Sequence, residues 1–396
     1  MNLKRLWVTI IAGGQGTRLF PISHPSCPKQ FCDLDSQNTF IQAVIGNFTS
    51  LGIKPTHIVI ITTSDDQTTL AKKQCLSRGI LSQNILQISP EVGYAGAMVY
   101  ASNVIYEFDQ TAIVINTPAD QYLAKSEEFK KTVEAAVFEA ENCDSVIIGV
   151  KVNDLNTVMG CGHAIYDDAP EDAPCFAVES FVEKPDRVLA DKIMRQGNSA
   201  CNTGINVWRA SRICKIFDGY SYFGLSTDGM MNHFESLKVA VGNFDWHDCG
   251  TLKSLYEISK KTPNHKNASL GKGSFERVEC RRSLLYAGEN MELRVAGAED
   301  DAVIFTVINE RPIVIVAKLS DSQKIKRLAE DYFKHEDILT ADFSMGARNN
   351  IVLRSNISKE LIVGFVGVEN YAVYAHRKPD GQLVAVVSEQ LSLVKS

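Results

Sequence analysis

The feature that most constrains this chain is an alternation of apolar, strand-length runs with amphipathic segments over about its first 250 residues. The apolar runs are continuous, which is typical of strands that are buried on both faces of a sheet. Alternating strands and helices predict a three-layer, Rossmann-like α/β domain with a mostly parallel sheet. The predicted strands are Trp7–Ala12, His57–Thr63, Ala112–Thr117, Ser145–Val152, Cys175–Val182 and Gly204–Trp208.

Two of the segments between these runs show helical periodicity. In Thr39–Phe48, aromatic and β-branched residues recur at three- and four-residue spacing. Ser126–Asn142 carries an apolar stripe that begins after a serine suited to the N-cap, and Glu127 and Glu128 suit the positive end of a helix dipole. We therefore expect a helix in each segment.

The pattern changes after residue 262. Residues 263–275 are polar and contain proline and glycine, which indicates a linker. The residues beyond it form short β-like runs, with one helix predicted over Ser320–Phe333. Because 396 residues are enough for two domains, we expect an α/β domain over 1–262, a linker over 263–275 and a β-rich domain over 276–396.

The β-rich part contains an internal similarity. Gly297–Ile304 resembles Gly367–Tyr374, seventy positions later, in a shared glycine, glutamate and Ala-Val pair. A two-copy repeat of this kind suggests stacked coils or sheets. Coincidence within β-rich sequence is the alternative.

The charge distribution argues against a polymer ligand. The net charge is −6, from 41 basic and 47 acidic residues, whereas nucleic-acid binders usually have a basic excess. Residues 1–32 contain four basic residues and no acidic one, so this segment is +4 and the remaining residues sum to −10. A local cationic patch suits a small anionic ligand, although chance clustering of four charges would look the same.

The cysteines and the hydropathy pattern indicate a cytoplasmic protein. No apolar run reaches the ~18 residues that a membrane-spanning helix needs. The ten cysteines are scattered and form no Cys-x-x-Cys pair, so they are expected to be reduced, mostly buried thiols rather than disulfides or zinc ligands.

A glycine-rich segment directly follows the first predicted strand. It runs Ala12-Gly13-Gly14-Gln15-Gly16-Thr17-Arg18-Leu19. Glycines at such a turn let backbone N–H groups approach phosphate oxygens. A Walker A loop is excluded because no Gly-Lys-Ser/Thr follows, and a dinucleotide fingerprint is excluded because Leu19 stands where a glycine is required. The candidate nucleotide-binding residues here are Ala12, Gly13, Gly14, Gly16 and Thr17.

This segment resembles the signature of the sugar-nucleotide pyrophosphorylases, Gly-Gly-x-Gly-Thr-Arg-Leu-x-Pro followed by Pro-Lys. Within that family, Phe20–Ser23 and Pro28–Phe31 are most similar to mannose-1-phosphate guanylyltransferases. The resemblance implies transfer of a nucleotidyl group from an NTP to a sugar 1-phosphate, which gives an NDP-sugar and pyrophosphate. The similarity to guanylyltransferases implies GTP and mannose 1-phosphate as the substrates and GDP-mannose as the product. It assigns Arg18 and Lys29 to the triphosphate. Fixed cations there would also offset the repulsion between two phosphates that react in line.

Two aspartates match the family's Mg²⁺ site. Asp120 ends Asn116–Asp120, after a buried strand, and resembles the aspartate of Pro-Ala-Asp-His, with Gln121 in place of histidine. Asp248 resembles the aspartate of Trp-x-Asp-x-Gly. Two carboxylates with phosphate oxygens and waters satisfy Mg²⁺. Each aspartate alone would also suit a helix or turn cap.

Three segments match the sugar-phosphate pocket of the family. The resemblance assigns Glu183 and Asn202 to sugar hydroxyls, Lys184 to the sugar phosphate and Gly162 to packing against the sugar. Cys161 and His163 depart from the family's Gly-Tyr-Gly-Tyr pattern around Gly162. A solvated Glu–Lys pair at a strand end is the alternative for the 183–184 segment.

The base-binding segment matches the family least. Only Gly93 is retained, and the Arg, Asn and Thr that follow it in guanylyltransferases are replaced by Tyr94, Ala95 and Gly96. Guanine specificity is therefore implied by the family rather than by these residues. The resemblance also implies that the tail is a left-handed β-helix-like module, through which the protein would form a homo-oligomer.

Two other interpretations stay open. The chain could act on another base or sugar, such as a heptose 1-phosphate, or it could be a non-catalytic paralogue that senses nucleotide sugars. A Rossmann dehydrogenase fails on Leu19 and on the missing acidic residue at the end of the second strand.

Overall fold

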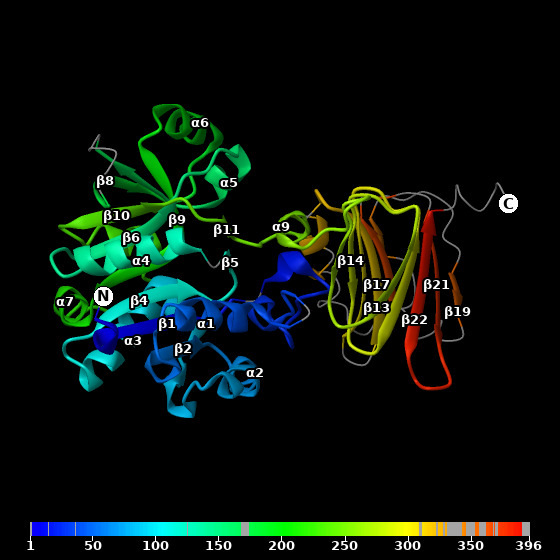
Figure 1. Ribbon diagram of the computed structural model, residues 1–396, viewed down its shortest axis with the longest axis horizontal. Helices are drawn as coiled ribbons and strands as arrows, with labels where there is room; N and C mark the ends of the chain where they lie inside the picture. The colour runs from blue at the N-terminus through cyan, green and yellow to red at the C-terminus, as the bar shows by residue number, and fades with distance from the viewer. Residues whose placement is uncertain are drawn as a thin grey trace. The chain divides into compact units, whose positions relative to one another are not determined.

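The computed structural model describes residues 2–389 except 15, 36, 125, 168–173, 309–310, 322–323, 328, 331–342, 346–352, 356–361, 367 and 369–370. The chain divides into two compact units (Figure 1). The first comprises Met1–Gly13 and Ile41–Asp248, and the second comprises Gly14–Phe40 and Cys249–Ser396. The predicted domain boundaries at 262 and 275 stay a prediction.

The described strands of the first unit form one mixed sheet in the order β3-β2-β1-β4-β9-β6-β10-β8-β7. All six runs predicted from the sequence lie in it as strands, and β3, β7 and β10 were not predicted. The strands are β1 (Leu6–Ile11), β2 (Ile58–Thr62), β3 (Ile85–Gln87), β4 (Ile113–Pro118), β6 (Ser145–Val150), β7 (His163–Tyr166), β8 (Phe176–Val182), β9 (Ser199–Arg209) and β10 (Leu237–Gly242).

The expectation of a mostly parallel sheet is wrong. Strands β1 to β4 and the β6–β10 pair are parallel, but β9 runs antiparallel between β4 and β6, and β7 and β8 also pair antiparallel. The reason is that a continuous apolar run reports burial on both faces, which an antiparallel central strand shares with a parallel one. Strand direction is not encoded in that pattern.

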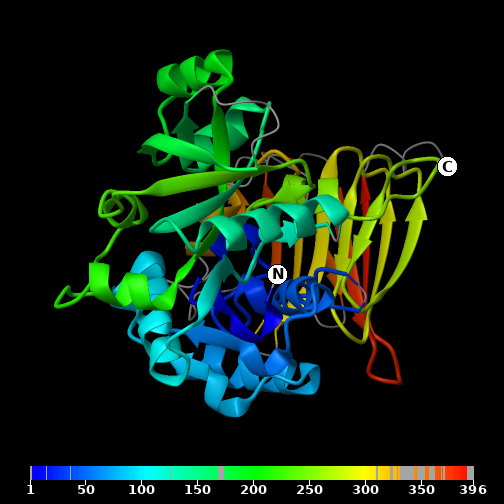
Figure 2. The ribbon, with the colours of Figure 1, turned by 60° about the vertical axis from the view of Figure 1, so that its left-hand side comes forward.

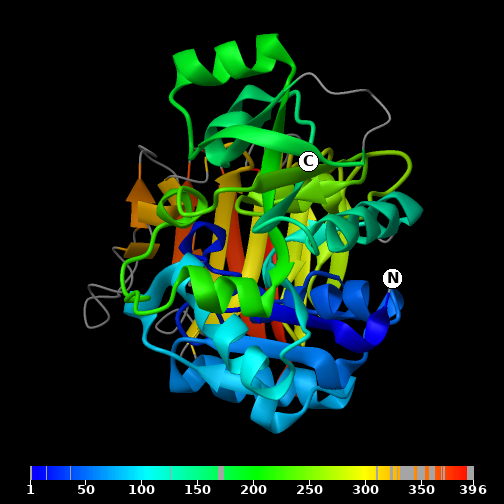
Figure 3. The same ribbon diagram turned by 90° about the vertical axis from the view of Figure 1, so that its left-hand side faces the viewer.

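Helices cover both faces of this sheet, as the alternation predicted. The helices α1 and α4 lie on one side (Figure 3), where the Phe48 and Phe129 rings meet edge to face at 6.0 Å. On the other face α3, α7 and α8 pack in one apolar cluster with the sheet. The helices are α1 (Phe40–Ser50), α2 (Asp65–Cys75), α3 (Gly93–Phe108), α4 (Glu127–Glu139), α5 (Leu155–Gly160), α6 (Arg187–Gln196), α7 (Ala210–Ile216) and α8 (Thr227–Met231).

Both helices predicted from periodicity are present as α1 and α4. The predicted cap is also confirmed, because the Ser126 side chain accepts a hydrogen bond from the backbone N–H of Phe129. A separate two-stranded ladder of β5 (Tyr122–Leu123) and β11 (Trp246–His247) lies beyond the end of β4. No helix among the described residues is long and apolar enough to cross a membrane.

The second unit has α9 (Leu252–Ile258) and two sheets, yellow to red in Figure 2, whose facing side chains form its apolar core. One sheet has the order β12-β14-β16-β17-β20-β18 and the other β13-β15-β22-β21-β19. Successive strands from β12 to β16 alternate between the two sheets. Their bounds are β12 (Ala268–Leu270), β13 (Ser274–Val278), β14 (Leu284–Ala287), β15 (Met291–Ala296), β16 (Asp301–Ile308), β17 (Arg311–Lys318), β18 (Phe343–Met345), β19 (Leu353–Ser355), β20 (Ile362–Val366), β21 (Tyr371–Arg377) and β22 (Leu383–Glu389).

The two copies of the sequence repeat occupy corresponding places in these sheets. Each copy ends within the first strand of an antiparallel hairpin. These hairpins are β16–β17 in one sheet and β21–β22 in the other. The Tyr371 hydroxyl donates to the Asp301 carboxylate at 2.6 Å, so the first residues of the two hairpins touch. Part of the second copy lies outside the described residues. The helix predicted over 320–333 is confirmed at residues 324–327 and 329–330, and residues 322–323, 328 and 331–333 lie outside the described residues. The left-handed β-helix form stays a prediction.

Candidate active site

The glycine-rich loop begins in the first unit, where it leaves β1. The Ala12 N–H donates to the Ile61 carbonyl at 2.8 Å, and the Gly13 carbonyl accepts from Thr63 Oγ1 and Gln67 Nε2 at 3.2 and 3.3 Å. A Cβ atom on Gly13 would lie 2.6 Å from Thr63 Cγ2. The close approach to β2 therefore requires glycine at this position.

The rest of the loop lies in the second unit, next to the Pro-Lys segment. Gln30 Nε2 donates to the Gly14 carbonyl at 2.9 Å, and the Ser23 hydroxyl donates to the Gly16 carbonyl. Gly16 has φ of +66°, and a Cβ there would overlap the Lys29 side chain. Sequence reasoning quoted Gln30 only as part of a motif, whereas its amide holds the loop to the lysine segment.

The two predicted triphosphate ligands differ in exposure. Arg18 is exposed on the single turn Thr17–Leu19, while Lys29 is 3% exposed at the start of the turn Lys29–Phe31. The Lys29 ammonium lies 5.5 Å from the centre of the Phe40 ring, within range of a cation–π contact. Burial costs an ammonium its hydration, so an anion bound beside it would gain strongly from the charge.

In the first unit, the β5–β11 ladder brings the two predicted metal-binding segments together. Tyr122 pairs with His247, and their rings lie 6.1 Å apart. Asp248 directly follows β11 and Asp120 lies two residues before β5, so both residues lie beside the same end of the ladder. Asp248 is exposed, while Asp120 is half-buried.

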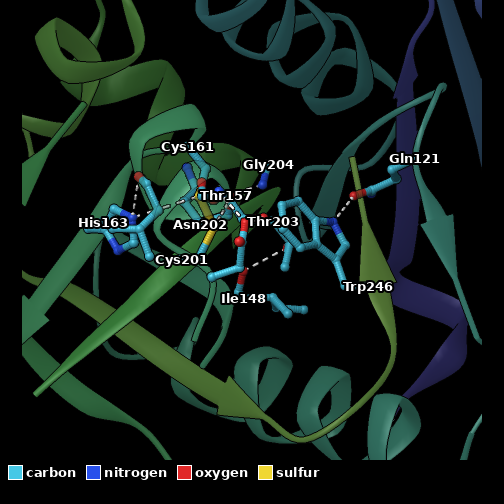
Figure 4. Close-up of a disulfide and its surroundings, with 12 residues drawn as sticks. Gln121, Ile148, Thr157, Cys161, His163, Cys201, Asn202, Thr203, Gly204 and Trp246 are labelled. Carbon is cyan, nitrogen blue, oxygen red and sulfur yellow. Dashed lines mark hydrogen bonds between the residues drawn. A yellow bond between two sulfur atoms is a disulfide. The ribbon is translucent and has the colours of Figure 1, made fainter. Parts of the chain in front are cut away.

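A pair of side chains that sequence reasoning missed supports this ladder. The Trp246 indole N–H donates to Gln121 Oε1 at 2.6 Å (Figure 4), and Gln121 Nε2 donates to Thr117 Oγ1 at 2.9 Å. Gln121 is 3% exposed, so both of its amide groups are engaged inside the protein. The sequence hint to this contact is Gln121 itself, which replaces the family's histidine, but the sequence does not reveal its partner.

Tyr94 joins the start of α3 to β9. Its hydroxyl donates to the Gly204 carbonyl at 2.8 Å, and burial, together with the nearby Asp120 charge, raises the Tyr94 pKa well above its ordinary value. Gly204 has φ of +78°, and a Cβ there would lie 2.7 Å from Pro118 Cγ. Asp120, Tyr94 and the middle of β9 are therefore neighbours.

The segments predicted to hold the sugar phosphate also converge. A Cβ on Gly162 would lie 2.6 Å from Glu183 Oε2 and 2.5 Å from Phe181 Cζ, so Gly162 packs directly on them. The Asn202 N–H donates to the Gly162 carbonyl at 2.8 Å, and Asn202 Oδ1 accepts from the Gly204 N–H at 2.8 Å. Lys184 is 66% exposed and forms an ion pair with Glu183 at 3.4 Å.

The prediction that all ten cysteines are reduced thiols is wrong for one pair. Cys161 and Cys201 form a disulfide (Figure 4). The eight other cysteines, all within the described residues, form no disulfide. The scattered spacing misled the sequence reasoning because the partners are 40 residues apart and only the pairing of β7 with β9 brings them together.

The predicted base segment opens α3. Gly93 has φ of +70°, which glycine adopts without strain. Gly96 leaves room for the Tyr222 carbonyl, which a Cβ would overlap. The residues that depart from the guanylyltransferase pattern thus pack α3 against the rest of the first unit.

A comparison with protein families decides the relationship. The model of the nucleotidyl transferase family matches residues 8–265. The chain belongs to the nucleotidyl transferase family. It is therefore an enzyme of the transferase class that takes nucleoside triphosphate and sugar phosphate substrates, and members of the family generally use a divalent metal.

Several relatives of this nucleotidyl transferase are named as mannose-1-phosphate guanylyltransferases or as an alginate biosynthesis protein. Mannose-1-phosphate guanylyltransferase 2 of Escherichia coli O157:H7 is 24% identical over 83% of this chain and 75% of its own length. Mannose-1-phosphate guanylyltransferase RfbM of Salmonella typhimurium is 25% identical over 83% of this chain and 72% of its own. The alginate biosynthesis protein AlgA of Pseudomonas aeruginosa is 23% identical over 81% and 71%.

A solved structure shares the fold of the nucleotidyl transferase. It is described as mannose-1-phosphate geranyltransferase from Thermus thermophilus, and it aligns with a TM-score of 0.69 and 21% identity. The alignment covers 83% of this chain and 99% of that one.

Proposed function

We propose that this nucleotidyl transferase makes GDP-mannose and pyrophosphate from GTP and mannose 1-phosphate. The guanylyltransferase relatives, which align over about four-fifths of the chain, support the choice of substrates. The observation that supports the chemistry is the β5–β11 ladder, because it joins the two segments that carry Asp120 and Asp248.

The donor triphosphate is assigned to the glycine-rich loop and its two cations. Backbone N–H groups from Ala12, Gly13, Gly14, Gly16 and Thr17 would bind phosphate oxygens. Arg18 and Lys29 would neutralise charge that builds up at the α-phosphorus during in-line attack. The sugar phosphate is already anionic, so the attack needs no side chain as a general base.

Asp120 and Asp248 fit a hard divalent cation. They offer two carboxylates, at least one of them exposed, and Mg²⁺ commonly takes one or two carboxylates with phosphate oxygens and waters. Bound Mg²⁺ would supply charge neutralisation to the triphosphate. The chain's own contribution would be to support the two segments that carry these carboxylates, through the ladder and the Gln121–Trp246 hydrogen bond.

The sugar 1-phosphate is assigned to Gly162, Glu183, Lys184 and Asn202. Glu183 packs on Gly162, and Asn202 is hydrogen-bonded to it, so three of the four form one cluster. Carboxylate and amide groups suit sugar hydroxyls, and the exposed Lys184 ammonium suits the phosphate. Gly93 is assigned to the base, and guanine is chosen from the relatives alone.

One assay tests this function against its alternatives. Pyrophosphate release is measured over the four common NTPs and a set of hexose and heptose 1-phosphates, with Mg²⁺ and with chelator. We expect turnover for GTP with mannose 1-phosphate only when the metal is present. Preference for another pair would replace the substrates, and nucleotide-sugar binding without any turnover would favour the non-catalytic paralogue.

Two further assignments accompany this function. We place the enzyme in the cytoplasm, where GTP and sugar phosphates are available. We also expect a homo-oligomer formed through the β-rich second unit, where β13 is mostly exposed, including Val278 at 61%. Light scattering of the whole chain at several concentrations tests the assembly, and a constant monomer mass would contradict it.

A further inference from the structure

The Cys161–Cys201 disulfide lies between two residues of the proposed sugar-phosphate cluster. Cys161 immediately precedes Gly162, and Cys201 immediately precedes Asn202. The disulfide, shown in Figure 4, therefore joins the two residues that directly precede the partners of the backbone hydrogen bond from Asn202 to Gly162. Since β7 already pairs with β9 through His163 and Cys201, the covalent link mainly constrains the turn that enters β7.

The two sulfur atoms differ in exposure. Cys201 is 1% exposed, whereas Cys161 is half-buried at the end of α5, where its sulfur lies 3.0 Å from the Thr157 carbonyl. An external thiolate would therefore reach the Cys161 sulfur first. Disulfides that are partly exposed are the ones that exchange with other thiols, while fully buried ones resist reduction.

We propose that Cys161 and Cys201 form a reversible redox pair that controls binding of the sugar 1-phosphate. The co-reactant is a dithiol. Its thiolate attacks the Cys161 sulfur, the Cys161–Cys201 bond breaks, and the Cys201 sulfur leaves with the electron pair and takes up a proton. The second thiol of the dithiol then displaces Cys161 as a thiol, so the protein gains two electrons and two protons and the dithiol becomes a disulfide.

Reduction would loosen the pocket without unfolding the sheet. The β7–β9 pairing remains, but the Gly162 turn is then held to Asn202 by a single backbone hydrogen bond. Gly162 supports Glu183, so a shift of the turn moves two of the proposed sugar ligands apart. This step rests on the proposed function, because it takes these residues as the sugar-phosphate site.

A metal site is the competing interpretation of the same residues. Cys161, His163 and Cys201 place one ligand atom each within 4.8 Å of one another. However, His163 Nε2, which lies 3.7 Å from the Cys161 sulfur, is also 2.9 Å from the Val158 carbonyl. A carbonyl can only accept, so Nε2, the ring nitrogen beside the Cys161 sulfur, donates there and offers a metal no lone pair.

The decisive test is a redox titration of the whole wild-type chain with and without GDP-mannose. The protein is equilibrated in mixtures of reduced and oxidised dithiothreitol, its thiols are trapped with a maleimide, and the peptides that contain Cys161 and Cys201 are quantified by mass spectrometry. Because linkage is reciprocal, a ligand that binds the disulfide form more tightly must stabilise it by the same factor. We expect roughly a tenfold shift, which is about 30 mV for a two-electron couple.

The controls separate this inference from the proposed function. GTP alone should leave the midpoint unchanged, since the pair borders the sugar cluster only. An unchanged midpoint with GDP-mannose, an equal shift with GTP alone, or one equivalent of zinc bound to the reduced protein would each overturn the redox pair. The titration does not depend on turnover. An active enzyme whose redox midpoint is unchanged by GDP-mannose would therefore contradict this inference and leave the proposed function intact.

Kinetics of matched variants provide a second measurement. In the wild type, reduction should raise the KM for sugar 1-phosphate roughly tenfold with little change in the KM for NTP. Cys161→Ser should show the raised KM under both oxidising and reducing conditions. Cys214→Ser, which removes a half-buried thiol in α7 that forms no disulfide, should still respond to reduction as the wild type does. A Cys161→Ser variant that still responds would contradict the assignment.

Discussion

Two parts of the first unit support their proposed ligand-binding residues by different means. Figure 4 shows the Trp246–Gln121 hydrogen bond of one part and the Cys161–Cys201 disulfide of the other. At the proposed metal end, a two-stranded ladder and the hydrogen bond from Trp246 to Gln121 join the segments that carry Asp120 and Asp248. At the sugar end, Gly162 and Asn202 are joined by a backbone hydrogen bond and a neighbouring disulfide. The first support is independent of the redox state, whereas the second depends on it. Metal binding and sugar binding should therefore respond to different perturbations.

The largest effect is expected from removing a metal carboxylate. Asp120→Asn should lower metal-dependent pyrophosphate release by more than about 100-fold, the upper range for residues that only support a metal ligand. The reason is that an amide keeps the shape of the side chain but lacks its charge. Steady-state rates over a Mg²⁺ titration measure the loss.

Asp245→Asn is the matched control for that substitution. Asp245 is an exposed aspartate three residues before Asp248, and its backbone carbonyl, which the substitution keeps, accepts from the Ala124 N–H. Its rate should stay near that of the wild type. Retained activity in Asp120→Asn, or an equal loss in Asp245→Asn, would remove the metal assignment.

The support of the metal end should be separable from its ligands. Trp246→Phe leaves the buried Gln121 Oε1 without its donor, so the free energy of unfolding should fall by about 1–3 kcal/mol. The Mg²⁺ concentration for half-maximal activity should rise about tenfold, because a misplaced ladder shifts both carboxylates. Urea unfolding and Mg²⁺ titration measure the two effects.

Trp7→Phe provides the comparison for this variant. It also removes an indole donor, here from a 3.2 Å hydrogen bond to Asp109. Stability should fall, but the Mg²⁺ requirement should not change. A similar rise in the Mg²⁺ requirement for both variants would mean that Gln121 and Trp246 have no special connection to the metal.

The sugar end should be sensitive to a single methyl group. In Gly162→Ala the new Cβ would lie 2.6 Å from Glu183 Oε2, so the carboxylate must move. We expect the KM for sugar 1-phosphate to rise roughly tenfold while the Mg²⁺ requirement stays constant. Gly160→Ala adds the same methyl group two residues earlier in open space and should leave that KM unchanged. Equal values for the two variants would contradict the sugar assignment.

The sequence could predict most of the elements but not how they meet. Each of the six apolar runs forms a strand, because two-sided burial leaves a direct trace in residue type. The direction of β9 leaves no such trace. The family resemblance predicts Asp120 and Asp248 as metal ligands, which stays a prediction. The Trp246–Gln121 and Cys161–Cys201 contacts join residues 125 and 40 positions apart. Contacts of this kind follow from strand pairing, which a single sequence does not reveal.

The smallest effect is expected at Tyr94, which connects the two ends. Tyr94→Phe removes the hydrogen bond to the Gly204 carbonyl and should cost about 1 kcal/mol of unfolding free energy. The Tyr94 pKa is raised in the folded protein, so its contribution is complete below the unfolded value near 10 and is lost as the pH rises above it. Unfolding curves at pH 8 and pH 11 should therefore differ more for the wild type than for the variant.

If both the Mg²⁺ requirement and the sugar KM change in Tyr94→Phe, the two ends are coupled through β9. If neither changes, the ladder and the disulfide position their ligands independently.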